Sequence, residues 1–191
     1  KALQSIKPIK ASELKERVVR GQYQTGDLNG TEVPGYTSED RVPEDSKTET
    51  FLAAKFYMDN WRWAGVPILL RTGKRLPKKV TEISIQFKKP PLQWFKTVEC
   101  EGDRCDLTHA KPNVLTFTIA PDESISLNFS AKRPSMQVVV ENATMDFTYS
   151  DHWTKALPEA YERLLLDVMR GDSTLFTRSD EVETAWRVVD P

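Results

Sequence analysis

The chain has 191 residues, of which 39% are hydrophobic and 29% are charged, and its 27 Lys plus Arg against 28 Asp plus Glu give a net charge of −1. This composition is typical of a globular protein, excludes a disordered chain, and provides for one domain that buries about 70% of its unfolded surface. The balanced charge argues against a general nucleic-acid binder, and no apolar run reaches the roughly 18 residues that a membrane-spanning helix needs.

The N-terminal part predicts one helix followed by a long connection. The chain begins at Lys1 with no methionine and no secretory signal, so we expect a piece of a longer protein. The stretch KASELKERVVRGQY predicts a helix with Ser12 as its N-cap and Gly21 at its end. Residues 22–48 are rich in Gly, Pro and polar residues, and a connection of this length is either pinned to the surface or functional.

The next residues are ambiguous between helix and strand. In TETFLAAKFYMDNWRW the apolar residues alternate from Leu52 to Met58 as in a strand, but Ser46-x-x-Glu49 also fits a capping box at a helix start. The aromatic residues favour the strand. The following stretch, VPILLRTG, predicts a short buried strand that ends at Gly73.

The middle of the chain predicts antiparallel strands. VTEISIQF alternates polar residues with apolar ones from Thr81 to Phe87, as in a sheet with one apolar face. NVLTFTIAPDESISLNFS predicts two strands that turn at Pro121-Asp122. MQVVVENATMDFTYS predicts a further strand.

Residues 88–112, between these strands, predict a second long polar loop. Cys100, Cys105 and His109 have a spacing compatible with three zinc ligands, but a structural site needs a fourth. Two loop thiols and a surface histidine are therefore the favoured interpretation. Two cysteines are also too few for a disulfide framework, which favours a reducing, cytoplasmic location.

The C-terminal part predicts two helices. LPEAYERLLLDVMRG begins at Pro158, carries an apolar stripe and stops at Gly171. RSDEVETAWRVV predicts a last helix with Ser179 as its N-cap. A helix, a run of strands and two more helices predict an α+β fold, with a large mostly antiparallel sheet and helices packed on one face. We expect residues 1–191 to form a single domain.

One segment, LLRTGKRLPKKV at residues 69–80, concentrates positive charge in four side chains: Lys74, Arg75, Lys78 and Lys79. Cations this close repel one another unless each is solvated or an anion lies among them. A strand that ends in glycine, followed by lysines, predicts a pocket for an anion, most simply a phosphate. A solvated basic turn is the alternative, and composition alone favours it.

The sequence holds no complete catalytic machinery. GxGxxG, GxxxxGK[ST] and GxSxG are all missing, which excludes the corresponding dinucleotide, P-loop and hydrolase sites from this chain. Neither His109 nor His152 lies within a catalytic motif. We therefore assign no catalytic residue and no metal ligand.

Several longer segments together carry a family resemblance: VVRGQY (18–23), VPGY (33–36), VPEDSKTETF (42–51), NWRWAGVPILLRTGKRL (60–76), PDE (121–123), AYERLLLDVMRG (160–171) and RSDEVETAWRVVD (178–190). With them the chain resembles, over nearly its whole length, the C-terminal domain of glucose-6-phosphate dehydrogenase. The resemblance implies an oxidoreductase of the pentose phosphate pathway. Its reaction oxidises glucose 6-phosphate to 6-phosphoglucono-1,5-lactone, with NADP as the hydride acceptor.

The resemblance also implies which residues and partners matter. Lys74 and Lys79 match the residues that reach the substrate, and the sheet is expected to mediate a homo-dimer or tetramer. The family's N-terminal dinucleotide-binding domain and its catalytic-histidine motif, RIDHYLGKE, do not occur in this sequence. Because hydride transfer requires that domain, the fragment alone is expected to be inactive.

Two departures from the family pattern concern ligands. Ala120 stands where many members have a glutamine that contacts the sugar, which puts one substrate hydrogen bond in doubt. Val80, Ser84 and Thr118 stand where some members hold a second, structural NADP with basic residues, so no structural NADP is expected. The alternative function is a stand-alone, non-catalytic module for sugar-phosphate binding or oligomerisation, and neither nucleic acid nor a membrane is an expected partner.

Overall fold

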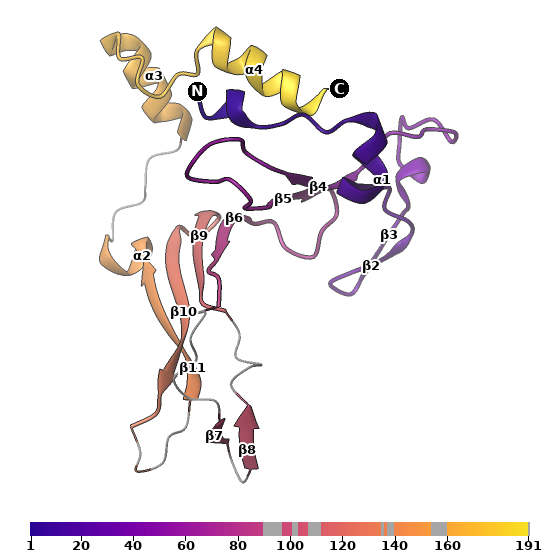
Figure 1. The fold of residues 1–191 in the computed structure, drawn as a ribbon. Helices are drawn as coiled ribbons and strands as arrows, with labels where there is room; N and C mark the ends of the chain where they lie inside the picture. The colour runs from indigo at the N-terminus through magenta and orange to yellow at the C-terminus, as the bar shows by residue number, and fades with distance from the viewer. Residues whose placement is uncertain are drawn as a thin grey trace. The chain divides into compact units, whose positions relative to one another are not determined.

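The computed structural model describes residues 1–89, 97–100, 103–106, 112–134, 136, 140–153 and 160–190. The chain divides into two compact units, residues 1–77 with 158–191 and residues 78–157, and each has its own principal sheet (Figure 1). The assignment of all 191 residues to one domain stays a prediction. In the described part of the chain, no helix combines the length and apolar character needed to cross a membrane.

The first unit is built on an antiparallel sheet with strand order β1-β4-β5, formed by Val18–Gly21, Phe51–Phe56 and Ile68–Gly73. The central strand β4 supplies the buried residues Ala54 and Phe56, and Ile9 completes this small core. The predicted strand after residue 50 is therefore confirmed. The prediction that the strand ending at Gly73 is buried is wrong, because Leu69 and Leu70 of the edge strand β5 are exposed.

The predicted N-terminal helix is wrong beyond Arg17. Short 3₁₀ segments, η1 at Leu3–Ser5 and η2 at Ala11–Glu13, precede a single helical turn, α1 at Leu14–Arg17. Ser12 lies inside η2 and caps nothing, whereas the Glu13 carboxylate accepts the Lys10 N–H at 3.1 Å. Val18 then starts β1, because a β-branched side chain that pairs with β4 fits a strand better than a helix.

The long connection at residues 22–48 is more regular than predicted. It contains a hairpin of β2, Gly26–Leu28, and β3, Thr31–Val33, and the 3₁₀ turn η3, Tyr36–Ser38. Its ends are pinned together, because the Gln22 side-chain amide donates to the carbonyls of Ser46 and Thr48, both at 2.8 Å. Of the two alternatives for this segment, pinning to the surface is thus realised.

Both predicted C-terminal helices are confirmed, as α3 at Ala160–Arg170 and α4 at Ser179–Val189. Gly171, with φ of +71°, follows α3 at once, and Val188 of α4 packs against the core of the first unit. The N-cap of α4 is Arg178 rather than Ser179. Pro158 lies outside the described residues. Most of the apolar stripe of α3 is exposed, at Tyr161, Leu165, Val168 and Met169.

The second unit is an antiparallel sheet with strand order β11-β10-β9-β6, formed by Val140–Thr148, Ser124–Lys132, Val114–Ala120 and Thr81–Gln86. The register gives it two different faces. One face carries the apolar row Ile83, Phe117, Ile125, Phe147, and the other carries the polar row Ser84, Thr116, Ser126, Asp146. The predicted alternation and the turn between β9 and β10 are both confirmed.

The loop predicted at residues 88–112 contains a hairpin of β7, Thr97–Cys100, and β8, Asp103–Asp106. In its backbone register Cys100 is opposite Asp103 and Cys105 is opposite Val98, while His109 lies outside the described residues. The short helix α2, Tyr149–His152, follows β11. The α+β class with antiparallel strands is confirmed, although the strands are distributed over two principal sheets.

Candidate functional site

The basic segment begins where β5 ends at Gly73, beside the first residue of β4. A Cβ added at Gly73 would lie 3.0 Å from Phe51 Cδ2 and 3.3 Å from the Thr50 carbonyl oxygen. Both distances are shorter than ordinary carbon contacts of about 3.5–4.0 Å. A side chain at residue 73 would therefore crowd the Phe51 ring and the Thr50 backbone, which would have to shift by a few tenths of an ångström.

Thr50 fixes the backbone of this turn through hydrogen bonds. Its carbonyl accepts the Lys74 N–H at 2.8 Å, and its own N–H donates to the Gly21 carbonyl at 2.9 Å. Its hydroxyl accepts the Tyr23 N–H at 3.0 Å. Thr50 is buried, so one residue joins the end of β1, the start of the long connection and the basic turn.

The Arg75 side chain ties the turn to the long connection. Its guanidinium forms an ion pair with the Glu39 carboxylate and lies 5.6 Å from the centre of the Tyr23 ring. The Tyr23 hydroxyl donates to the same carboxylate at 3.1 Å. The bond to Glu39 and then the contact with Tyr23 raise the pKa of Arg75 above its ordinary value. Arg75 is a cation at physiological pH in any case, so the cluster adds no titration there.

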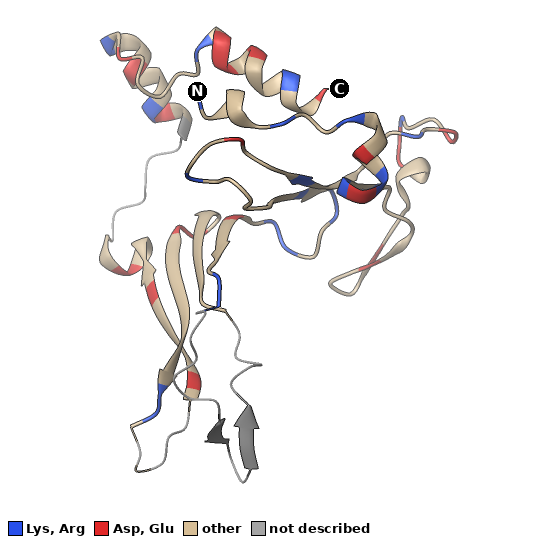
Figure 2. Cartoon of the chain, in the orientation of Figure 1, with Lys and Arg blue, Asp and Glu red and all other residues tan. Residues whose placement is uncertain are grey.

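The four cations of the segment therefore fall into two kinds. Arg75 has its own anion, whereas the exposed side chains of Lys74, Lys78 and Lys79 form no ion pair with any residue that the structure describes. Figure 2 shows the basic colour along the connection that leaves β5. Lys74 belongs to the first unit, and Lys78 and Lys79 begin the second. Among the described residues, therefore, no carboxylate neutralises these three lysines.

The residues that fix the turn were not predicted from the sequence. Glu39 lies 36 residues before Arg75, and Tyr23 and Thr50 lie at the two ends of the long connection. The unusual length of the connection at residues 22–48 was the one sequence signal that pointed to a role for this segment. No local pattern indicates that the Glu39 carboxylate meets the basic turn.

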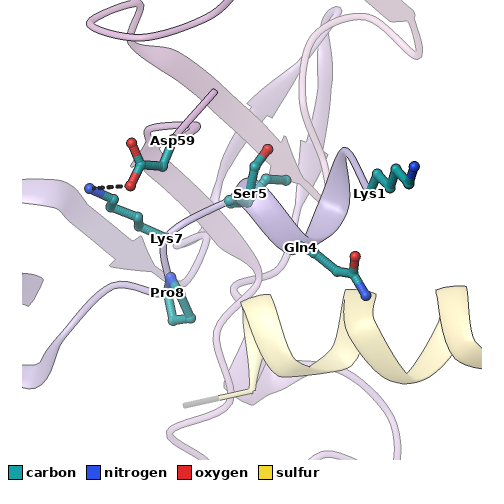
Figure 3. Close-up of a pocket in the computed structure, with 7 residues that line it drawn as sticks. Lys1, Gln4, Ser5, Lys7, Pro8 and Asp59 are labelled. Carbon is teal, nitrogen blue, oxygen red and sulfur yellow. Dashed lines mark ion pairs between the residues drawn. The ribbon is translucent and has the colours of Figure 1, made fainter. Parts of the chain in front are cut away.

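A pocket near the N-terminus is a weaker candidate site. It is lined by Lys1, Gln4, Ser5, Ile6, Lys7, Pro8 and Asp59 (Figure 3). Its one carboxylate, on Asp59, is paired with the Lys7 ammonium at 3.1 Å, and both side chains are well exposed. No histidine or cysteine lines the pocket. It therefore offers a solvated ion pair rather than a group that could act as an acid or a base.

The histidines and cysteines add no site among the described residues. The His152 ring stacks on the Phe147 ring, with ring centres 4.7 Å apart, and meets the Trp153 ring edge to face, with centres 6.0 Å apart. His152 therefore belongs to an aromatic cluster. In the part of the chain that the structure describes, no group of three or more His, Cys, Asp or Glu side chains could hold a metal ion. The zinc alternative, which the sequence did not favour, includes His109, which lies outside that part, so the structure does not test it.

Comparisons with known proteins agree with the resemblance found in the sequence. The family model described as glucose-6-phosphate dehydrogenase, C-terminal domain, matches residues 1–191. Glucose-6-phosphate 1-dehydrogenase of Aggregatibacter actinomycetemcomitans is 43% identical over the whole chain, and that of Chlamydia pneumoniae is 44% identical. In both cases the match covers 36% of the relative, so this chain spans little more than a third of the length of these proteins.

Solved structures show the same fold. One described as glucose-6-phosphate dehydrogenase in complex with its substrate glucose-6-phosphate has a TM-score of 0.81 and 34% identity, and the match covers 98% of this chain and 35% of that one. The Mycobacterium avium enzyme has a TM-score of 0.71 and 33% identity, covering 100% of this chain and 35% of its own. The chain belongs to the glucose-6-phosphate dehydrogenase C-terminal domain family.

Proposed function

We propose that residues 1–191 act as the C-terminal substrate-binding and dimerisation domain of a glucose-6-phosphate 1-dehydrogenase. The complete enzyme would oxidise glucose 6-phosphate to 6-phosphoglucono-1,5-lactone in the cytoplasm, with NADP as the hydride acceptor. In that reaction a hydride leaves C1 of the sugar for NADP, and the proton of the C1 hydroxyl passes to a base. The described residues provide no nucleotide-binding loop at the basic turn, and the one carboxylate there, on Glu39, is paired with Arg75, so we expect the domain alone to be inactive.

Lys74 is the residue that carries this proposal. Its backbone is fixed by the Thr50 carbonyl, its side chain is exposed, and no carboxylate of the described residues neutralises it. A phosphate or a sugar hydroxyl can therefore bind the ammonium without first displacing an internal partner. A charge-assisted hydrogen bond of this kind contributes about 1.5–3 kcal/mol.

Lys79 is proposed as the second substrate contact. It is exposed and has no ion-pair partner among the described residues, and the same is true of its neighbour Lys78. Only Lys79 matches the second basic position that the family resemblance implies. Lys78 therefore provides a matched control, because it has the same charge and exposure one residue away.

We propose that no structural NADP binds to the sheet of the second unit, because of the residues at the three positions that match the family's site. Val80 is apolar, and the Ser84 hydroxyl lies 3.2 Å from the Thr116 hydroxyl as its neighbour across β6 and β9. Thr118 is opposite the acidic Glu82. None of the three matching positions has the cation that would balance a nucleotide phosphate, so we propose that NADP is bound mainly by the rest of the enzyme.

We propose further that the enzyme is a homo-oligomer, a dimer or tetramer, held together through the sheet. The sheet of the second unit exposes apolar side chains, including Ile83, Ile119 and Met145, and exposed apolar surface of this kind is typical of interfaces. A stand-alone, non-catalytic module for sugar-phosphate binding or oligomerisation is the second candidate function. The pairing of the Glu39 carboxylate with Arg75 at the turn is compatible with it.

The test uses the full-length enzyme and three single variants. Lys74→Ala is expected to raise the KM for glucose 6-phosphate by about 10- to 150-fold, which corresponds to the 1.5–3 kcal/mol given above. Lys79→Ala is expected to raise the same KM, and Lys78→Ala is expected to leave it unchanged. If Lys74→Ala has the wild-type KM, Lys74 is not in the site. If the full-length gene product binds the sugar phosphate but does not reduce NADP, the non-catalytic module is correct.

A further inference from the structure

We propose that Glu39, Arg75 and Tyr23 form a positioning cluster that holds Lys74 in place for the sugar phosphate. The cluster rests on the proposed function, because it acts through Lys74. Arg75 follows Lys74 directly in the chain, and its guanidinium is anchored to a segment of the long connection 36 residues away. We infer that this anchor, together with the bond from the Lys74 N–H to the Thr50 carbonyl, fixes the direction in which the Lys74 side chain leaves the backbone.

The backbone at Arg75 shows why an anchor is needed. Its φ is +53°, which lies in the left-handed region that residues other than glycine rarely adopt. Such a conformation has a free-energy cost, which contacts of the side chain can offset. The ion pair with Glu39 and the Tyr23 ring are the contacts that the structure gives Arg75 for this purpose.

Tyr23, the member of the cluster that contacts both Arg75 and Glu39, is itself held in place by its neighbours. The Tyr23 N–H donates to the Thr50 hydroxyl at 3.0 Å, and the Tyr23 carbonyl accepts the Tyr36 N–H at 3.1 Å. The Tyr23 and Tyr36 rings meet edge to face with centres 5.7 Å apart. Tyr23 therefore orients the Glu39 carboxylate through its hydroxyl while its own backbone is tied to Thr50.

Lys74 thus lies between two fixed points that converge on Thr50. On the N-terminal side, the Lys74 N–H donates to the Thr50 carbonyl. On the C-terminal side, the next residue, Arg75, pairs with Glu39. Tyr23 links Glu39 back to Thr50, because its hydroxyl donates to Glu39 and its N–H donates to the Thr50 hydroxyl. Only the rotatable bonds of the lysine side chain remain free. A lysine whose Cα is fixed loses less freedom when it binds an anion, which favours binding.

Arg75 itself is a poor candidate for the phosphate ligand. Its side chain is 33% exposed, and its guanidinium is already engaged with Glu39 and the Tyr23 ring. A phosphate that bound Arg75 would have to displace a carboxylate from a partly desolvated pair. The structure therefore assigns Arg75 a positioning role and leaves direct contact to Lys74.

The test is a double-mutant cycle in the full-length enzyme. Arg75→Ala and Glu39→Gln are each expected to raise the KM for glucose 6-phosphate at least about threefold, the size of a modest coupling between neighbours, with the KM for NADP unchanged. In a Lys74→Ala background, Arg75→Ala is expected to cause no further rise. Tyr23→Phe removes only the hydroxyl and serves as a mild second variant if Arg75→Ala does not fold.

The matched control is Arg41→Ala. Arg41 also has a positive φ, of +65°, and an ion pair, with Asp40 at 3.3 Å, but both side chains are 92% exposed. It is expected to leave every kinetic constant unchanged. Equal rises in KM for Arg75→Ala with and without Lys74 would overturn the positioning role, as would a wild-type KM in Arg75→Ala and Glu39→Gln. A wild-type KM in Lys74→Ala would instead overturn the proposed substrate site together with this cluster.

Discussion

The hydroxyl of Thr50 allows a sharp test of how the candidate site is held. Thr50→Val keeps the shape of the side chain and both backbone hydrogen bonds of this residue, but it removes the acceptor of the Tyr23 N–H, which is bonded at 3.0 Å. Thr50 is 9% exposed, so water replaces the lost acceptor poorly. The bond is partly buried, so leaving the Tyr23 N–H without a partner is expected to cost up to about 1–3 kcal/mol of stability.

This loss can be measured by denaturant unfolding and by hydrogen exchange in the peptide that contains Tyr23. The same 1–3 kcal/mol corresponds to about a 5- to 150-fold faster exchange of the Tyr23 amide. The matched control is Thr48→Val, two residues earlier, where the hydroxyl contacts the exposed Ser46 hydroxyl at 3.3 Å. A surface change of that kind is expected to stay within about 0.5 kcal/mol. If the two variants are equally stable and exchange alike, Thr50 does not join the turn to the long connection.

Two further predictions concern backbone and charge. Gly73→Ala is expected to destabilise the protein by about 1–3 kcal/mol through overpacking against Phe51, and an unchanged melting temperature would contradict the close approach. The Thr174 hydroxyl and N–H, at 2.6 and 2.9 Å, lower the pKa of Asp172 below its ordinary 3.8. The negative charge therefore stabilises the fold above that value, and this contribution disappears as the pH falls through the lowered pKa. An Asp172→Asn variant should lose this part of the acid sensitivity, which NMR titration can follow.

Local patterns in the sequence determined a large part of the fold. The strict alternation from Thr81 to Gln86 and the turn at Pro121-Asp122 led to correct strands, because period-two patterning and turn residues act over a few neighbours. The same is true of the helix at residues 160–170, which has helical spacing and a glycine stop. The spacing of the four cations after Gly73 raised the hypothesis of an anion site, because close positive charges repel one another, but composition alone favoured a solvated turn.

Tertiary structure decided what those patterns left open. Residues 18–21 have the local pattern of a helix that continues, yet they form a strand because pairing with β4, 30 to 36 positions later, outweighs a weak helical preference. Likewise, Lys74 and Arg75 are both simply positive charges in the sequence. Only the fold brings Glu39 and Tyr23 to Arg75, which neutralises one cation, while its neighbour Lys74 has no ion-pair partner in the part of the chain that the structure describes. Contacts between residues so far apart in the chain depend on three-dimensional packing, and no local pattern encodes them.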